Sequence, residues 1–129
     1  MPQAPPPDFV PAPNLGRHPD IYELENEALA RDGRLDAALQ RIAPWAGRRL
    51  LDVGCGSGFW LPRYAVRAGS VRGVEPDPAL RARADERVAG LSGCTVHAGS
   101  AEHLGVPDAS VDVAHARFAY FFRPGAEAG

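Results

Sequence analysis

One short segment constrains the fold of this chain more than any other feature: Leu51-Asp52-Val53-Gly54-Cys55-Gly56-Ser57-Gly58. Its glycines directly follow an apolar run from Arg49 to Val53, which indicates a strand that ends in a tight loop, because glycine adopts turn conformations that other residues avoid. A helix is expected from Phe59 to Ala68, ended by Gly69. Strand, tight loop and helix in this order are typical of a parallel α/β sheet.

The chain after this segment continues to alternate strands and helices. Strands are expected at 70–75, 94–98 and 111–116, with a helix at 78–88 that has an arginine-rich outer face. Strands that alternate with helices at this spacing favour right-handed crossovers. The predicted fold class is therefore α/β, a Rossmann-like parallel sheet with flanking helices.

Two further helices are expected before the glycine segment. Apolar residues recur at helical spacing from Asp20 to Gly33 and again from Leu35 to Ile42. Residues 1–18 are rich in proline and are predicted to form a flexible arm, so the domain is expected to comprise residues 19–129. The apolar residues that share one face of the first helix are Ile21, Leu24, Ala28 and Leu29.

Composition limits the partners that we expect. A hydrophobic share of 45% and a charged share of 23% are ordinary for one globular domain. The formal net charge is -2, without the basic surplus typical of nucleic-acid binding, so no nucleic acid is expected as a partner. No apolar stretch is long enough for a membrane span, and Cys55 and Cys94 form no metal-ligand or disulfide pattern. We expect a cytoplasmic protein with neither a membrane partner nor a metal site.

The glycine segment and one later acid indicate the kind of ligand. A dinucleotide-binding loop of the form G-x-G-x-x-G that begins at Gly54 requires glycine at position 59, where this chain has Phe59. The turn is expected to present backbone N–H groups to an anionic group of the ligand. Asp52 adds a carboxylate that repels a pyrophosphate but attracts an ammonium group, and Glu75 ends the second strand, where an acid can reach ribose hydroxyls. The pattern favours a nucleoside with an amino-acid end.

These residues resemble the small stand-alone class I S-adenosylmethionine-dependent methyltransferases. The glycine segment is similar to their first motif, and Gly73-Val74-Glu75-Pro76 is similar to their second. Residues 99–104 and 107–112 look like their adenine-contact segment and the approach to their fourth strand. The resemblance implies that the chain is a methyltransferase with S-adenosyl-L-methionine as its cofactor.

The resemblance also implies roles for single residues. Gly54 and Gly56 would cradle the methionine end of the cofactor, Asp52 would hold its amino group and Glu75 would bind the ribose. The predicted cofactor site comprises Tyr22, Asp52, Gly54, Cys55, Gly56, Gly58, Glu75, Pro76, Ser100 and Ala101.

At the adenine end, Pro76 and Ala101 would flank the ring by the same resemblance. Ser100 stands where the family often has Asp, so a hydroxyl replaces one carboxylate contact to the adenine amino group. Tyr22 has two open interpretations, a closing contact over the cofactor and core packing.

Catalytic residues have a weaker signal. Methyl transfer from a sulfonium centre needs an aligned acceptor and no acid–base pair. Of the histidines, His115 near the carboxyl end of the fourth strand is the better catalytic candidate, with a structural role as the alternative. The aromatic run from Phe118 to Phe122 either lines an acceptor pocket or packs under structure outside this chain, and we favour the second interpretation. The expected acceptor is a small molecule of unassigned identity.

The C-terminal strands of the methyltransferase fold are expected to be missing. Similar proteins continue after the fourth strand with a helix and further strands, whereas residues 123–129 have the composition of a flexible tail. The fourth strand would then be an exposed edge through which the chain could self-associate. Three functions stay open: a methyltransferase, an S-adenosylmethionine-binding module that needs a partner and, less favoured, an NAD-dependent oxidoreductase.

Overall fold

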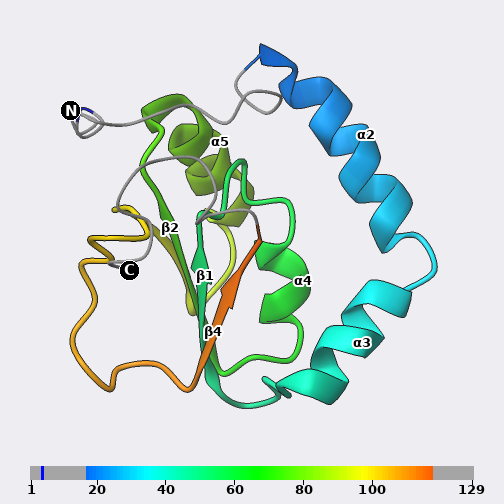
Figure 1. Cartoon of the computed structure of the whole chain (residues 1–129), viewed down its shortest axis with the longest axis vertical. Helices are drawn as coiled ribbons and strands as arrows, with labels where there is room; N and C mark the ends of the chain where they lie inside the picture. Colours follow the sequence, from blue (N-terminus) through cyan, green and yellow to red (C-terminus); the bar gives the residue numbers. More distant parts are fainter. Residues whose placement is uncertain (1–3, 5–16, 118–129) are drawn as a thin grey trace.

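A computed structural model describes Ala4 and residues 17–117 (Figure 1). The elements are α2 (Pro19–Ala30), α3 (Arg34–Ile42), β1 (Arg49–Val53), α4 (Leu61–Ala65), β2 (Ser70–Glu75), α5 (Pro78–Val88), β3 (Cys94–Ala98) and β4 (Val113–Ala116). They follow the predicted order, and β1, β2, β3 and α5 have the predicted bounds.

Short-range interactions account for several of these bounds. Helix α5 begins where Pro78 suits the first helical turn, and the Asp77 carboxylate accepts the amide hydrogens of Ala79 and Leu80 at 2.9 and 3.3 Å. Strand β4 begins at Val113, later than predicted. The carboxylate of the preceding Asp112 accepts hydrogen bonds from the main-chain amide and the guanidinium of Arg49, the first residue of β1.

The four strands form one parallel sheet in the order β3-β2-β1-β4. The chain runs outward from β1 to β2 and β3 and then returns to place β4 on the other side of β1, so the strand order reverses between β1 and β4. In such sheets ligands bind at the carboxyl ends of the strands near this reversal. The register sets Asp52 of β1 between Gly73 of β2 and His115 of β4, close to that edge.

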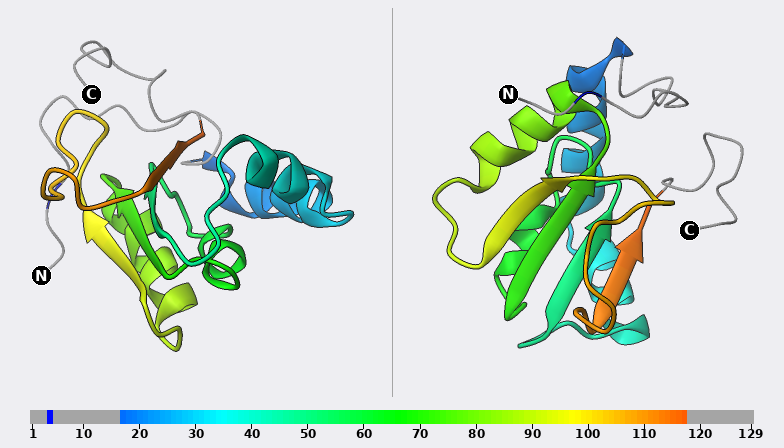
Figure 2. Two further views of the ribbon diagram at one scale, coloured as in Figure 1. Left: turned by 90° about the horizontal axis from the view of Figure 1, so that it is seen from below. Right: turned by 90° about the vertical axis from the view of Figure 1, so that its left-hand side faces the viewer.

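Apolar side chains are buried on both faces of the sheet. Because side chains of a strand alternate between its faces, Leu50 belongs to a cluster with α4 and α5, whereas Leu51 and Val53 belong to a second cluster. The second cluster is covered by residues from the segment 99–112, on the side of the sheet opposite α4 and α5 (Figure 2). The predicted fold class is confirmed by this arrangement.

The predicted apolar face of α2 is exposed. Ile21, Leu24 and Leu29 are 54%, 65% and 51% exposed. The buried residue of α2 is Asn26, whose Oδ1 accepts a hydrogen bond from the Trp60 indole at 3.0 Å. Polar contacts of Asn26, together with packing of Ala30 against the core, therefore attach this helix to the rest of the domain, whereas its large apolar residues Ile21, Leu24 and Leu29 are exposed.

The arginines of α5 are not all on an outer face, which corrects the expectation from the sequence. Arg81 is buried, and its guanidinium donates to the main-chain carbonyl of Glu75 at 2.9 Å. Arg83 and Arg87 form ion pairs with acidic residues of α2. One side of α5 thus packs on the sheet, while Arg83 and Arg87 on its exposed side pair with acids of α2.

Some predictions concern the ends of the chain. The aromatic run 118–122, the tail 123–129 and most of the arm 1–18 lie outside the described residues. Strand β4 forms one edge of the described sheet, and self-association through that edge stays a prediction. None of the helices in the described ranges is long and apolar enough to cross a membrane.

Candidate functional site

The glycine segment forms the expected tight loop at the end of β1. Gly54, Gly56 and Gly58 have φ values of 71°, 59° and 78°, a region that glycine adopts without steric cost. The amides of Gly54 and Cys55 both donate to the Val74 carbonyl at 2.8 and 3.0 Å. These bonds attach the loop to the end of β2.

The loop amides have partners within the protein. Besides the two bonds to Val74, the Gly58 amide donates to the Cys55 carbonyl at 3.0 Å, and the Gly56 amide donates to the Glu75 carboxylate at 2.8 Å. The expectation that this turn offers its N–H groups to an anionic ligand therefore fails for these four amides. Their glycines can still contribute a backbone without side chains, which a ligand can approach closely.

Glu75, the last residue of β2, connects the loop to the next turn. Its Oε2 accepts the Gly56 amide and its Oε1 accepts the Asp77 amide at 3.0 Å. Glu75 is 6% exposed, and burial raises the pKa of its carboxyl group to about 7, although both amide hydrogen bonds oppose that shift. A carboxylate has about four lone-pair sites, so Glu75 can also accept ligand hydroxyls while it holds the loop.

Asp52 is a second buried carboxylate, at the end of β1. Burial raises the pKa of Asp52, while His115 and Arg117 act in the opposite direction. The Nδ1 atom of His115 lies 3.9 Å from Asp52 Oδ1. A buried carboxylate has a desolvation cost, which an ammonium group of a ligand would offset.

His115 is held in place by an aromatic neighbour. Its Nδ1 lies 2.9 Å from the Tyr64 hydroxyl, and the two rings pack edge to face with centroids 5.5 Å apart. Tyr64 is buried in the helix-covered core. The structure therefore assigns His115 a place beside Asp52, and its suggested catalytic role stays a prediction.

A hollow of about 230 Å³ lies beside Pro76, next to the carboxyl end of β3. Ser100 lines this hollow, and its hydroxyl is buried without a hydrogen-bond partner among the described residues. Burial of a hydroxyl without a hydrogen bond lowers stability by about 1–3 kcal/mol. A polar ligand atom that bonded to the Ser100 hydroxyl would remove this cost. The hollow is smaller than pockets of roughly 300–1,000 Å³ that enclose a drug-sized ligand, so it suits one ring. Its lining is Ala4, Pro76, Arg81, Ala98, Gly99, Ser100 and His103.

Three other predicted site residues have different surroundings. Ala101 is buried in the cluster beneath the segment 99–112 rather than along the hollow. Cys55 packs against Gly73, where an added Cβ would lie 2.8 Å from the sulfur atom, and burial raises the pKa of the Cys55 thiol. Tyr22 is half-buried on α2, and the α2 residue that contacts the loop is its neighbour Glu23.

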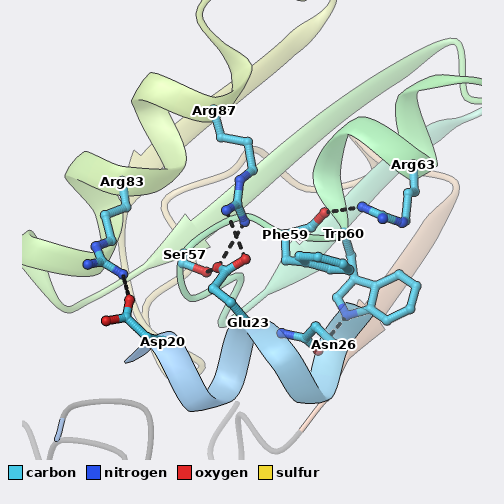
Figure 3. Close-up of polar contacts among 9 residues, drawn as sticks. All are labelled: Asp20, Glu23, Asn26, Ser57, Phe59, Trp60, Arg63, Arg83 and Arg87. Carbon is cyan, nitrogen blue, oxygen red and sulfur yellow. Dashed lines mark hydrogen bonds and ion pairs between the residues drawn. The ribbon is translucent and has the colours of Figure 1, made fainter. Parts of the chain in front are cut away.

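The sequence-based site omitted a polar cluster above the loop (Figure 3). Ser57 Oγ donates to Glu23 Oε1 at 2.6 Å, and Arg87 donates to both carboxylate oxygens of Glu23 at 3.1 and 2.9 Å. These side chains come from the loop, α2 and α5. Glu23 is 34 positions from Ser57 and 64 from Arg87, so no local pattern pairs them.

Comparisons with known proteins agree with this geometry. Residues 50–128 match a family described as "Methyltransferase domain". Over 60 residues the chain is 40% identical to the tRNA U34 carboxymethyltransferase of Ectopseudomonas mendocina, an alignment that covers 43% of this chain and 19% of that protein. The chain thus matches less than a quarter of that curated relative.

Two solved structures extend the likeness to the fold. An S-adenosylmethionine-dependent methyltransferase from Aquifex aeolicus has a TM-score of 0.61 at 25% identity, and the match covers 76% of this chain and 57% of that one. An S-adenosylmethionine-bound amino pentose methyltransferase from Micromonospora echinaspora has a TM-score of 0.56 at 32% identity, with 76% and 42% covered.

The expectation that nucleic acid is not a partner is wrong. Several curated relatives are tRNA U34 carboxymethyltransferases. The expectation relied on the net charge of -2, which is a sum over the whole chain. Contact with a phosphate backbone depends on local groups of basic residues, and a near-neutral sum does not exclude them.

The predicted family and cofactor are confirmed by these matches, which do not favour an NAD-dependent oxidoreductase. The strand order and the glycine loop agree with the family match over residues 50–128. The chain therefore belongs to the methyltransferase domain family, and its fold is that of the class I S-adenosylmethionine-dependent methyltransferases.

Proposed function

We propose that this chain binds S-adenosylmethionine at the carboxyl ends of β1, β2 and β3 and forms the cofactor-binding part of a methyltransferase. The observation that carries the proposal is the pair of buried carboxylates, Asp52 and Glu75, at the ends of two neighbouring strands beside the glycine loop. A ligand with an ammonium group at one end and a ribose in its middle complements that pair.

Each part of the site has a separate task in this proposal. Asp52 binds the amino group, and Glu75 accepts the ribose hydroxyls. The hollow beside Pro76 receives the adenine, and Ser100 offers a hydroxyl that has no hydrogen-bond partner among the described residues. The bound cofactor supplies a methyl group on a sulfonium centre with a good leaving group. The remaining requirement is to align an acceptor, which can contribute roughly 7–11 kcal/mol without proton transfer by the protein.

For the acceptor, the similar proteins include enzymes that act on different classes of molecule, among them tRNA and small molecules. Transfer to tRNA is supported by the names of several curated relatives. Transfer to a small molecule, the class expected from the sequence, is supported by the likeness to an amino pentose methyltransferase. We propose tRNA as the first class to test, because the local identity to those relatives includes values of 40% and 48%.

Calorimetric titration tests the cofactor proposal. S-adenosylhomocysteine should bind to the chain and NAD should not. Glu75→Gln and Asp52→Asn should each weaken S-adenosylhomocysteine binding by about 1.5–3 kcal/mol, the range for hydrogen bonds to charged groups. Asp108→Asn, at an exposed acid of the segment 99–112, is the matched control and should bind normally. Preferential binding of NAD would refute the proposal.

A labelling experiment tests the acceptor. The chain is incubated with S-adenosylmethionine that carries a labelled methyl group, together with unmodified tRNA or with a fraction of small metabolites. Label in the precipitated tRNA supports the first class, and label in the soluble fraction supports the second. Asp52→Asn should weaken either signal when the cofactor is below saturation, because it removes the proposed charged contact to the cofactor.

A further inference from the structure

An ion-pair cluster made of Glu23, Ser57 and Arg87 joins three separate elements at the glycine loop. The side chains of Glu23 and Arg87 are only 21% and 31% exposed, so solvent screens this pair less than a fully exposed one. Arg87 contacts both carboxylate oxygens, a bidentate geometry that fixes direction as well as distance. Burial acts to raise the pKa of Glu23, but the hydrogen bonds from Arg87 and Ser57 outweigh it and lower the pKa.

The glycine content of the loop makes its conformation costly to fix, so a contact that orders it has an effect on binding. Ser57 stands between Gly56 and Gly58, which both have positive φ, and glycine loses more conformational freedom on ordering than any other residue. The Ser57 hydroxyl is buried and bonded to Glu23. This bond orders the loop before a ligand arrives, and order that exists beforehand lowers the entropic cost of binding.

A second set of contacts holds α2 one turn further along. Asn26 Oδ1 accepts hydrogen bonds from the Trp60 indole and from Arg117 at 3.0 and 3.3 Å. The Arg117 guanidinium lies 4.5 Å from the centre of the Trp60 ring. Polar side chains of α2 thus contact the loop and the residues that follow it, while its large apolar side chains stay exposed.

We propose that α2 fixes the conformation of the glycine loop through the hydrogen bond between Ser57 and Glu23. Glu23 is then a positioning residue for the cofactor site. This inference rests on the proposed function. Glu23 contacts the loop and not the reacting atoms, so its effect is on the affinity for the cofactor. Neither Glu23 nor Ser57 is among the residues that the sequence assigned to the cofactor site.

The test compares two acids of the same helix. Glu23→Gln removes the charge that holds Ser57 and Arg87. Asp20→Asn is the matched control, because Asp20 also joins α2 to α5, through Arg83 at 3.9 Å, but its side chain is 93% exposed and this ion pair does not include the glycine loop. Glu23→Gln should raise the dissociation constant of S-adenosylhomocysteine about tenfold, and Asp20→Asn should leave it unchanged within about twofold.

Amide hydrogen exchange of the ligand-free protein provides an independent readout. Glu23→Gln and Ser57→Ala should each speed exchange at residues 54–58, and the double variant should exchange no faster than Glu23→Gln alone, because Ser57 acts through its bond to Glu23. If Glu23→Gln does not fold, Ser57→Ala replaces it, since it removes only one hydroxyl.

Unchanged affinity and unchanged exchange in Glu23→Gln would overturn the inference. Equal losses in Glu23→Gln and Asp20→Asn would also overturn it, because the effect would then be general docking of α2. If the unmodified chain bound no S-adenosylhomocysteine, the proposed function would fail, while the exchange comparison would still decide whether α2 orders the loop.

Discussion

Gly58 lies where the loop meets α5 with no room for a side chain. A Cβ at this position would lie 2.9 Å from the Cβ and 3.0 Å from the Cα of Ala84, and 3.3 Å from Leu61 Cδ1. Ala84 is fully buried on α5, so part of the clash is with helix backbone. Gly58→Ala must therefore displace either the loop or the helix.

Two costs add in this variant. The φ of +78° at Gly58 lies in the left-handed region, which costs a residue with a Cβ about 1–2 kcal/mol. Forcing an extra methyl group into a packed core typically costs about 1–3 kcal/mol. We therefore expect Gly58→Ala to lower the free energy of unfolding by about 2–5 kcal/mol.

Gly33→Ala separates these costs. Gly33 has a φ of +70°, and nothing lies within 4 Å of an added Cβ, so only the backbone cost of about 1–2 kcal/mol applies. Urea unfolding followed by circular dichroism measures both variants, and their difference is the packing cost between the loop and α5. Equal losses in the two variants would refute the packing argument. Full stability of both would refute the backbone argument as well.

Four further predictions concern charge and packing. Burial raises the pKa of Glu75 to about 7, above the usual 4.5, so protonation of Glu75 favours the folded state. The stability of the ligand-free protein should therefore fall as the pH rises from 4.5 to 7, and Glu75→Gln should reduce that slope in urea titrations. Affinity for S-adenosylhomocysteine should rise over the same range, since the ionised carboxylate is the better acceptor; a flat calorimetric profile would contradict this. Arg49 lowers the pKa of Asp112 to about 2, so Asp112→Asn should lower the melting temperature at neutral pH. The difference in melting temperature between the variant and the unmodified chain should disappear as the pH falls from 3.8 towards 2. A difference that did not change with pH would exclude the ion pair as its cause. Leu61→Ala, at a fully buried side chain, should cost about 2–5 kcal/mol in urea unfolding, whereas the exposed Val66→Ala should be near neutral, and similar losses would place Leu61 outside the core.

Local sequence signals were sufficient to predict the α/β fold class and the bounds of several of its elements. Alternating apolar residues, Pro78 at a helix start and glycines at a strand end act over a few residues, so β1, β2, β3 and α5 have the predicted bounds. Position 59 holds phenylalanine where a dinucleotide-binding loop requires glycine. Together with Asp52 and Glu75, this difference distinguished the loop from a dinucleotide-binding one. These signals are local because backbone conformation depends mainly on adjacent residues.

Only the tertiary structure decided how the elements contact one another around the loop. It buried Arg81, exposed the apolar face of α2 and joined Glu23 to Ser57 and Arg87. It also set the pKa of Glu75, through burial that no neighbouring residue in the sequence indicates. The loop itself was predictable because glycine geometry is local, whereas the contacts that order it join residues that are far apart in the sequence and meet only when the sheet and helices have packed.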